Sequence, residues 1–568
     1  MTTLEKERKT TMKTFHVRDY GILPGEKDRM NMLRLRGVLE ECRKNEEPVE
    51  ILFEEGTYHF YPDFAFERTL CISNHDEDTI KRIAFDLTNC THLTISGKNS
   101  DFIFHTELLA FYFEHGEDIT LEGFSIDYER PAYSEGTIVS VNGPSMQLRI
   151  DKERFPYYVA HQRIFFTGEN FCEEIPFWME VDPEKGEPSE GPYETGFDIR
   201  PDSNYGIWKE LEEGLVEVTL EGTGDLKSFE GYTPGHVIVL RHHPRSYPAA
   251  YVTASKDVTF RDVKIYHCAG MGVIAQFTEN ITLERVAITG KPGNGHWFSL
   301  AADATHFVYC RGLIHIKDCL FERQLDDAVN IHGIFARVKK ILSENELLVE
   351  LVHHQQKGVP VGTVGDTFSF VNYESLFSMG ESRAEEIVRL NKDFTYVKFE
   401  DRLPRDIKEK DSIENMSYVP DVLIEGCRVR NNRARGFLLG CAGKMIVRDN
   451  DFHTSGAAIL VAGDAADWFE SGSTRHIEIR ENRFNDCDHV KCWGQGVIQV
   501  DTPVREIGTD RKLHQYLEIR DNEFTSVDGE LVNVKNIQTV IFVGNKVTAP
   551  GSEETWVKLE DIGEYRNK

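Results

Sequence analysis

Three stretches near the C-terminus repeat one pattern: Ile477-Glu-Ile-Arg-Glu-Asn-Arg-Phe484, Leu517-Glu-Ile-Arg-Asp-Asn-Glu-Phe524 and Met445-Ile-Val-Arg-Asp-Asn-Asp-Phe452. The shared unit is an aliphatic residue, two polar residues, Asn or an apolar residue, one polar residue, and then Phe or Ile. Alternation over four to six residues indicates a strand. A helical repeat would need apolar residues spaced three and four apart over a longer segment, and these units are too short.

The unit recurs along the chain and predicts the architecture. It starts at Leu121, Phe260, Leu283, Ile316, Ile424, Val447, Ile479, Ile519 and Phe542. Three intervals are 23 residues, and intervals of 32, 33 and 40 fit loops inserted at a corner. This period, with two or three short strands per turn, predicts a right-handed parallel β-helix. The Leu-rich motif and regular helices of leucine-rich repeats are missing from the sequence.

The asparagines of the unit have a structural interpretation. Asn tolerates the left-handed conformation that a turn requires, and stacked Asn side chains can bond to one another along a solenoid. We expect such a ladder from Asn450, Asn482, Asn522 and Asn545. No chemistry is assigned to these residues.

The N-terminal segment predicts a cap for the solenoid. Phe15–Gly21 reads as a strand, and residues 26–44 carry apolar residues at helical spacing. These are Met30, Leu33, Leu35, Val38, Leu39 and Cys42. The strands Ile51–Phe53 and Gly56–Tyr58 follow, and a helix here would cover the open strand edges. Residues 1–11 are expected to be a poorly ordered tail.

Two stretches interrupt the repeat with alternating strands and Gly or Asn turns, residues 136–245 and 336–420. They predict two inserted antiparallel β-barrel-like domains. The remaining parts are then residues 12–135 with the cap and first coils, 246–335 with catalytic coils, and 421–568 with the C-terminal coils. The fold class is therefore all-β, with one capping helix.

Bulk composition excludes several functions. The 568 residues exceed one ordinary compact core but suit a solenoid. The formal charge of −30 argues against nucleic acid as a partner. No apolar run is long enough for a membrane span, and the charged N-terminus does not resemble a secretory signal. The 11 cysteines include no CxxC pair, so reduced thiols and a cytoplasmic location are expected. Exposed β domains are compatible with a homodimer.

The candidate catalytic residues are Asp303, Asp326 and Asp327. Neighbours on a strand point to opposite faces, so the Asp326-Asp327 pair needs a turn or bulge to reach one groove. Asp303 precedes Asp326 by 23 residues, one coil period, which predicts that it stacks beside the pair. Carboxylates held together raise the pKa of one member, creating an acid beside a base. Glycoside cleavage uses this combination.

The sequence around the trio resembles a known family. Asp303, together with Gln324-Leu325-Asp326-Asp327-Ala328-Val329-Asn330-Ile331-His332-Gly333, is similar to glycoside hydrolase family 110, the α-1,3-galactosidases. The resemblance covers most of the chain. It implies a β-helix with inserted barrels, hydrolysis of terminal α-1,3-linked galactose with inversion, including from blood-group-B-type glycans, and no cofactor or metal. It places the three catalytic aspartates on Asp303, Asp326 and Asp327.

We hypothesise that Asp326 is the general acid and that Asp303 and Asp327 activate the water. Candidate substrate-binding residues are His296, Trp297, Asn330, His332, Arg435 and Asp464. Arg433 and Arg435 lie at a coil corner where they could tune a carboxylate. Asp464, Asp467 and Trp468 form a loop two coils downstream that could reach the same groove, and Trp493 is a further stacking candidate.

Two other functions fit the pattern. Polygalacturonases also carry an aspartate trio on a β-helix, but polyuronides need a basic groove, and only Arg323 stands close to the trio in sequence. A non-catalytic carbohydrate-binding β-helix would tolerate the loss of its acids. Calcium-independent release of neutral galactose distinguishes the galactosidase from both.

Overall fold

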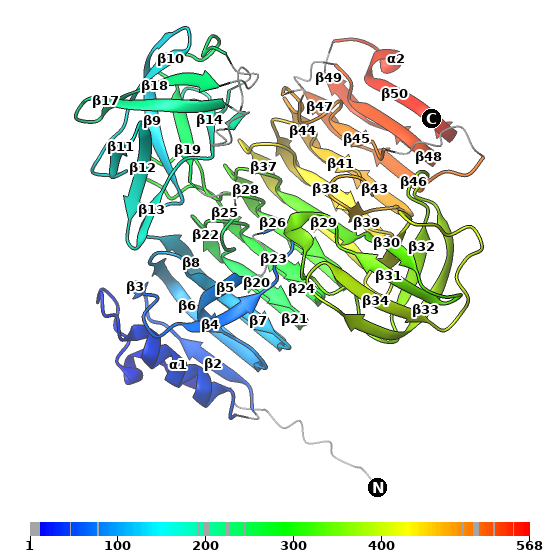
Figure 1. Cartoon of the computed structure of the whole chain (residues 1–568), viewed down its shortest axis with the longest axis horizontal. Coiled ribbons are helices and arrows are strands. Elements are labelled where there is room, and N and C mark those ends of the chain that lie inside the picture. Colours follow the sequence, from blue (N-terminus) through cyan, green and yellow to red (C-terminus); the bar gives the residue numbers. More distant parts are fainter. Residues whose placement is uncertain are drawn as a thin grey trace.

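The computed structural model describes residues 12–45, 47–75, 79–189, 194–196, 204–222, 227–242, 245–490, 492–503, 510–525, 529–548 and 550–567. A right-handed parallel β-helix runs from the N-terminal cap to β50 (Val557–Arg566), and two inserted β domains stand on its flanks (Figure 1). The predicted all-β fold class is confirmed. Within the described ranges, no helix has the length and apolarity needed to cross a membrane.

The repeat forms one continuous column of parallel strands. All nine unit positions from Leu121 to Phe542 pair in register with the next along the chain. The column contains β2 (Val49–Leu52), β6 (Thr91–Phe104), β8 (Glu117–Tyr128), β21 (Lys256–Arg261), β24 (Glu279–Glu284), β27 (Arg311–Lys317), β36 (Pro420–Glu425), β39 (Lys444–Arg448), β43 (His476–Arg480), β46 (His514–Arg520), β48 (Val532–Val543) and β50. β1 (Lys13–His16) pairs with β2.

Two further columns complete the coils. One contains β3 (Thr57–Phe60), β22 (Lys264–Ile265), β25 (Ala287–Ile288), β28 (Leu320–Glu322), β37 (Arg428–Arg430), β40 (Asp451–His453), β44 (Arg483–Asn485), β47 (Glu523–Thr525) and β49 (Lys546–Thr548), which β6 and β8 also join. The other contains β5 (Thr79–Asp86), β7 (Leu109–Glu114), β20 (Ala250–Thr253), β23 (Val273–Gln276), β26 (Thr305–Val308), β29 (Val329–Ile334), β38 (Phe437–Gly440), β41 (Ile459–Val461) and β45 (Ile498–Val500). β4 (Phe66–Leu70) pairs antiparallel with β5. The column from β5 to β45 carries the site described below.

The predicted asparagine ladder is present. Nδ2 of Asn450 donates to Oδ1 of Asn482 over 3.0 Å, and the same bond links Asn482 to Asn522 and Asn522 to Asn545. The prediction that Asn itself is left-handed is wrong. The residue before each rung takes the positive φ: 56° at Asp449, 59° at Glu481 and 55° at Asp521. That position bends the chain, which leaves the Asn side chain free to point into the buried ladder.

The interior of the solenoid is a continuous apolar core. The aromatic residues that end the repeat stack from coil to coil, with ring centroids 5.0 Å apart for Phe452 and Phe484 and 4.9 Å apart for Phe484 and Phe524. Near the cap, Phe85 and Phe111 stack at 4.5 Å. The ladder from Phe452 to Phe524 explains why the last position of the unit is Phe in the C-terminal coils, since stacking stabilises adjacent coils.

The predicted cap helix is α1 (Asn31–Cys42), which follows a 3₁₀ turn, η1 (Val17–Tyr20). Its buried face contains Met32, Leu35, Val38, Leu39 and Cys42. Met30 and Leu33 are exposed, so the prediction that they join the buried face is wrong. The helix starts one residue after Met30, and Leu33 falls on its outer side. A second helix, α2 (Glu553–Trp556), lies just before β50.

Both predicted β insertions are present. In the first, β15–β14–β19–β9–β10–β18–β17 form one sheet, to which β16 is added, beside the three-stranded sheet β11–β12–β13. Its strands are β9 (Tyr133–Asn142), β10 (Ser145–Arg149), β11 (Tyr157–Ala160), β12 (Arg163–Gly168), β13 (Phe171–Glu173), β14 (Phe177–Asp182), β15 (Glu187–Pro188), β16 (Glu194–Gly196), β17 (Asn204–Glu212), β18 (Leu215–Gly222) and β19 (Val237–Arg241).

The second insertion closes into a barrel of β30–β31–β34–β33–β32–β35. Its elements are β30 (Ala336–Ile341), β31 (Glu346–Glu350), the 3₁₀ turn η2 (His354–Gln356), β32 (Thr367–Val371), β33 (Ser378–Arg389), β34 (Phe394–Phe399) and β35 (Ser412–Asn415). A short strand, β42 (Glu470–Ser471), pairs antiparallel with the end of β29. In Figure 1 the strands β26, β29 and β38 lie between the two insertions.

Candidate active site

The three aspartates lie where the chain enters two stacked strands. Asp303 precedes β26, and the Asp326-Asp327 pair forms the bend between β28 and β29. Thr305 pairs with Val329, so the residue directly above Asp303 is Asp327, and Asp326 stands one position earlier. Asp303 therefore stacks beside the pair as predicted, and the residue in register with it is Asp327, one position beyond the 23-residue offset. Corner loops of unequal length change the offset from one column to the next.

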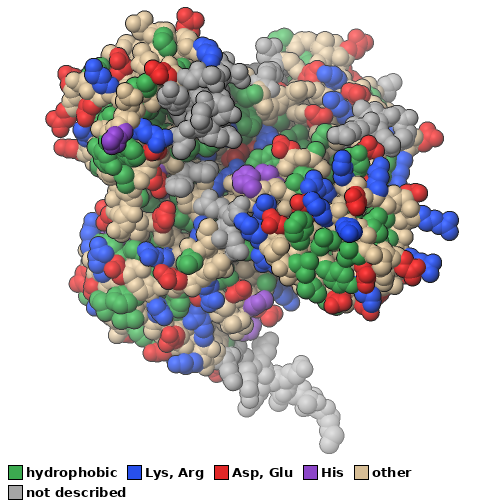
Figure 2. All heavy atoms as spheres, viewed as in Figure 1, with side chains coloured by type: hydrophobic (Ala, Val, Ile, Leu, Met, Phe, Trp, Pro, Cys, Tyr) green, Lys and Arg blue, Asp and Glu red, His purple; other side chains and the backbone are tan. Residues whose placement is uncertain are grey.

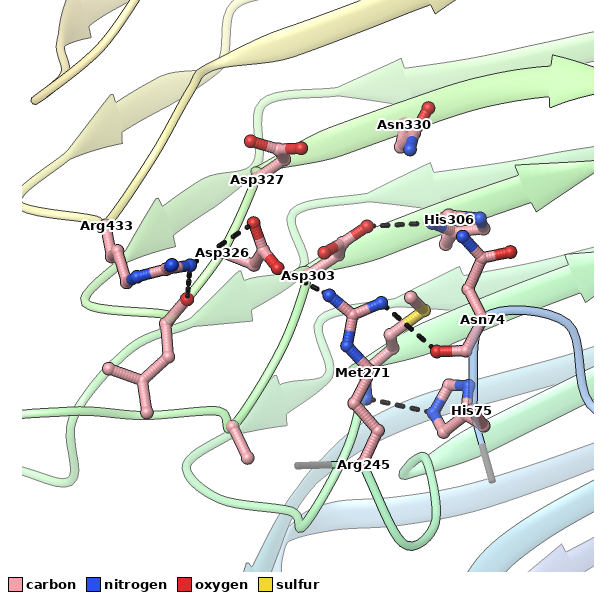
Figure 3. Close-up of polar contacts among 12 residues, drawn as sticks. Asn74, His75, Arg245, Met271, Asp303, His306, Asp326, Asp327, Asn330 and Arg433 are labelled. Atoms are coloured by element: carbon pink, nitrogen blue, oxygen red, sulfur yellow. Dashed lines mark hydrogen bonds and ion pairs between the residues drawn. The ribbon is translucent and has the colours of Figure 1, made fainter. Parts of the chain in front are cut away.

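All three carboxylates line one cavity of about 660 Å³. One oxygen from each aspartate lies within 4.8 Å of the other two. Figure 3 shows the side chains converging between β26 and β29. The Asp326 side chain is 14% exposed, whereas those of Asp303 and Asp327 are 4% and 3% exposed. Because Asp326 and Asp327 lie in a bend and not in a strand, both neighbouring side chains reach the same cavity.

Arginines surround Asp326. Arg245 Nη2 donates to its Oδ2 over 2.6 Å, and Arg433 Nη1 lies 3.7 Å from its Oδ1 (Figure 3). Arg433 Nη1 also donates to the carbonyl of Leu325, which fixes the guanidinium. Burial alone would raise the pKa of Asp326, but the charges of Arg245 and Arg433 outweigh it and hold the pKa below its usual value. Asp326 is therefore a carboxylate at neutral pH.

Asp327 is held by one arginine. Arg435 donates from Nε to Oδ1 and from Nη2 to Oδ2, each over 2.9 Å, and the Arg435 backbone N–H also donates to Oδ1. The two parallel bonds fix the position of the carboxyl group. Burial nevertheless raises the pKa of Asp327 to about 7, because burial outweighs the charge of Arg435, which lowers the pKa. The charges of Asp326 and Asp303 raise it as well.

Asp303 begins a buried hydrogen-bonded chain. Its Oδ2 lies 2.7 Å from Nδ1 of His306, and Nε2 of His306 lies 2.8 Å from Nε2 of His332. Nδ1 of His332 lies 2.6 Å from the carbonyl oxygen of Gly333. Burial, followed by the charge of Asp326, raises the pKa of Asp303 to about 8.

The end of this chain fixes one proton. The Gly333 carbonyl only accepts, so Nδ1 of His332 carries a proton, and Nε2 of His332 faces both Nε2 of His306 and Oε1 of Glu470, which lies 3.5 Å away. Burial lowers the pKa of His306 well below its usual value, so His306 is neutral and carries one ring proton. Burial and the charge of Asp326 give Asp303 the highest pKa of the trio, which makes it the protonated member at neutral pH.

Comparison with known proteins identifies the family. The "GLAA-B beta-barrel domain I" family matches residues 134–226, and "GLAA-B beta-barrel domain II" matches residues 346–413. The chain is 32% identical over 546 residues to alpha-1,3-galactosidase A of Shewanella woodyi, an alignment that covers 94% of this chain and 86% of that protein. The chain belongs to glycoside hydrolase family 110.

Other members of family 110 align equally broadly. An alpha-1,3-galactosidase B of Phocaeicola vulgatus is 30% identical over 94% of this chain and 90% of its own length. That of Bacteroides thetaiotaomicron is 28% identical over 94% and 86%. Among solved structures, the A-module of the Azotobacter vinelandii mannuronan C-5 epimerase AlgE4 aligns over 97% of this chain and 99% of its own, with 9% identity and a TM-score of 0.40.

Four of the six predicted substrate-binding residues line the cavity: Asn330, His332, Arg435 and Asp464. His332 belongs to the histidine chain, whereas Arg435 holds Asp327, in agreement with the expectation that the arginine corner tunes a carboxylate. Asn330 Nδ2 donates to Oε2 of Glu470 over 3.4 Å. The arginine corner thus acts on a carboxylate.

His296 and Trp297 lie outside this cavity, and the structure gives no support for their binding substrate. Arg154 contacts Nδ1 of His296 at 3.3 Å, and the backbone N–H of Trp297 donates to Oε1 of Glu135 over 2.8 Å. The Trp297 ring packs against a separate apolar cluster that includes Phe298. These contacts turn the segment before β26 toward the first insertion, where it braces that domain against the coils.

Several residues of the site were not predicted from the sequence. Arg245 follows the first insertion, Glu470 lies on β42, and His306 sits on β26. Oε1 of Glu470 accepts from Nδ2 of Asn74 over 2.8 Å, which joins the segment between β4 and β5 to β42. Of these three residues, His306 alone stands close to the trio in sequence, three residues after Asp303.

Among the residues that the structure describes, two groups at the cavity contain residue types that bind metals: the aspartate trio, and His306 with His332 and Glu470. A third group, His59, His105 and Glu129, lies in the first coils. In the trio, Asp326 and Asp327 face arginines, which would repel a cation. In the histidine group, the two Nε2 atoms bond to each other. We assign no metal to any of them.

Proposed function

We propose that this protein is an exo-acting α-galactosidase that releases terminal α-1,3-linked galactose with inversion. The observation that carries the proposal is the cavity, in which one protonated carboxyl group, Asp303, faces one carboxylate held ionised by arginines, Asp326. The curated members of family 110 named above supply the substrate class, because they are named alpha-1,3-galactosidases.

The shape of the site supports exo action on a neutral sugar. Phe177 of the first insertion, His354 of the second and Trp468 of a coil loop all line the cavity, so it is walled on several sides. Arg245, Arg433 and Arg435 are engaged by Asp326 and Asp327. The arginines therefore neutralise the aspartates, which disfavours a polyuronide substrate. In Figure 2, acidic and basic side chains are interspersed over the displayed face.

The proposed reaction is a single displacement. Asp303 donates its proton to the glycosidic oxygen as the bond from that oxygen to the anomeric carbon breaks. Asp326 takes a proton from a water whose oxygen bonds to the anomeric carbon from the opposite face. Galactose leaves as the β anomer. These pKa directions reverse our initial hypothesis, in which Asp326 was the acid.

Two features bear on inversion and disagree. The nearest carboxylate oxygens lie within 4.8 Å, closer than the roughly 6.5–9.5 Å usual between acid and base in inverting enzymes. In contrast, Asp303 is protonated, and a covalent bond to Asp326 or Asp327 would remove the negative charge with which the arginines pair. This pairing favours inversion, because a covalent intermediate would leave the arginines unpaired until it is hydrolysed, whereas a general base can release its proton at once.

Galactose release tests this function. The protein is expected to free galactose from α-1,3-galactobiose in the presence of a chelator and to leave polygalacturonate intact, as measured by chromatography of the products. Asp326→Asn is the matched inactive control. Cleavage of polygalacturonate alone would replace the proposal with a polygalacturonase. Binding of the disaccharide without turnover would indicate a non-catalytic lectin-like protein.

A further inference from the structure

Trp468 is an unusual side chain of this cavity. It is 39% exposed and lies in the loop between β41 and β42. Among the large apolar side chains that are exposed in the described ranges, it alone lines the 660 Å³ cavity. An exposed indole has a large apolar face that water solvates poorly, and such a face in a concave site is typical of ligand contact.

The backbone of Trp468 is fixed from both sides. Oδ2 of Asp464 accepts from its N–H over 3.0 Å, and Oδ1 of Asp464 accepts from the N–H groups of Ala466 and Asp467. On the other side, the buried Gln356 of the second insertion donates from Nε2 to the carbonyl of Trp468 over 2.9 Å. The loop is therefore preorganised, and Asp464 acts as its internal cap and not as a direct ligand.

The indole ring is also supported. The ring of His353 lies 4.5 Å from it between centroids at 32°, and the Arg245 guanidinium lies 5.9 Å from the ring centroid. The same guanidinium bonds to Asp326. A single arginine thus separates the ring from a catalytic carboxylate. The more enclosed part of the cavity contains Asp303 and Asp327, whereas Trp468 belongs to the exposed part.

We propose that Trp468 is the stacking platform of the aglycone subsite and binds the neutral sugar ring to which the leaving galactose is attached. This inference rests on the proposed function. Galactose occupies the enclosed part beside the aspartates, and the next pyranose ring places its apolar C–H face on the indole. The carboxylate of Asp467 on the same loop lines the cavity, where it accepts hydrogen bonds from hydroxyl groups and would repel a uronic acid.

The test compares a substrate with a sugar aglycone and one without. Trp468→Ala is expected to lower kcat/KM on α-1,3-galactobiose roughly tenfold, as loss of an aromatic stack predicts. Hydrolysis of α-galactosyl fluoride, whose leaving group occupies no sugar subsite, should change less than twofold. Trp468→Phe should restore most of the activity on the disaccharide. Tyr158→Ala removes an exposed aromatic residue outside the cavity and is the matched control.

Equal losses on both substrates, or no loss on the disaccharide, would overturn the platform. Thermal melting of both variants excludes unfolding as the cause of a loss. Calorimetric binding of the intact disaccharide to Asp303→Asn, with and without Trp468→Ala, gives an answer that does not depend on turnover. Unchanged affinity there also overturns the platform. Lack of hydrolysis of either substrate by the parent protein would instead contradict the proposed function.

Discussion

Asp303→Asn is expected to lower kcat on α-1,3-galactobiose by roughly 10²–10⁴-fold, the usual contribution of a general acid. The sugar leaving group is a poor one and needs the proton that Asp303 carries. Fluoride needs less protonation, so hydrolysis of α-galactosyl fluoride should fall much less. The alkaline limb of the wild-type kcat/KM profile should report the pKa of Asp303 at about 8, because activity is lost as this carboxyl group ionises.

Asp326→Asn is the matched variant and separates the two roles. A general base is needed whatever the leaving group, so Asp326→Asn should lower kcat by a similar factor on the disaccharide and on the fluoride. Activity of the wild type should persist well into the acid range, because the arginines hold the pKa of Asp326 below its usual value. If Asp326→Asn instead lost far more activity on the disaccharide than on the fluoride, Asp326 would be the general acid.

Arg435→Met is expected to lower the free energy of unfolding by about 1–2 kcal/mol more at pH 8 than at pH 5. Arg435 holds the pKa of the buried Asp327 carboxyl group down to about 7, and its removal raises that pKa further. The folded variant must therefore keep a proton on Asp327 at pH 8, which costs about 1.4 kcal/mol for each pH unit above the wild-type pKa. At pH 5 Asp327 is protonated in both folded proteins, so this difference disappears. Urea denaturation at the two pH values measures it.

The double variant Arg435→Met/Asp327→Asn is the control for this pair. Because it removes both charges, it should recover much of the stability at pH 8. An equal loss in Arg435→Met at pH 5 and pH 8 would mean that the arginine acts through packing of its apolar stem. Arg435→Lys should rescue only partly, since an ammonium group cannot form the two parallel bonds seen here.

The sequence predicted the solenoid because its information is local. A short repeat reports strand periodicity directly, and the in-register column from Leu121 to Phe542 follows even across two insertions. The asparagine ladder follows from the same unit. The pattern predicts a left-handed Asn450, whereas Asp449 has the positive φ. Asp and Asn both tolerate the left-handed region, so the sequence alone does not show which of the two adopts it.

The site was predicted only in part because its geometry depends on loop lengths. Asp303, Asp326 and Asp327 were recognisable as a cluster on adjacent coils, but their register depended on corner loops, so Asp303 meets Asp327. Arg245 and Glu470 reach the cavity from segments outside the repeat, so the coil period does not predict their position. These residues decide the charges in the cavity, which is why the initial assignment of the acid changed.

Proton NMR of the first turnovers on α-1,3-galactobiose tests the central claim most directly. The anomeric proton distinguishes the two forms of free galactose before mutarotation equilibrates them. A protonated Asp303 opposite an arginine-held Asp326 predicts that β-galactose appears first. Initial α-galactose would show retention and would make one of the arginine-bound carboxylates a nucleophile, contrary to the mechanism proposed for this site.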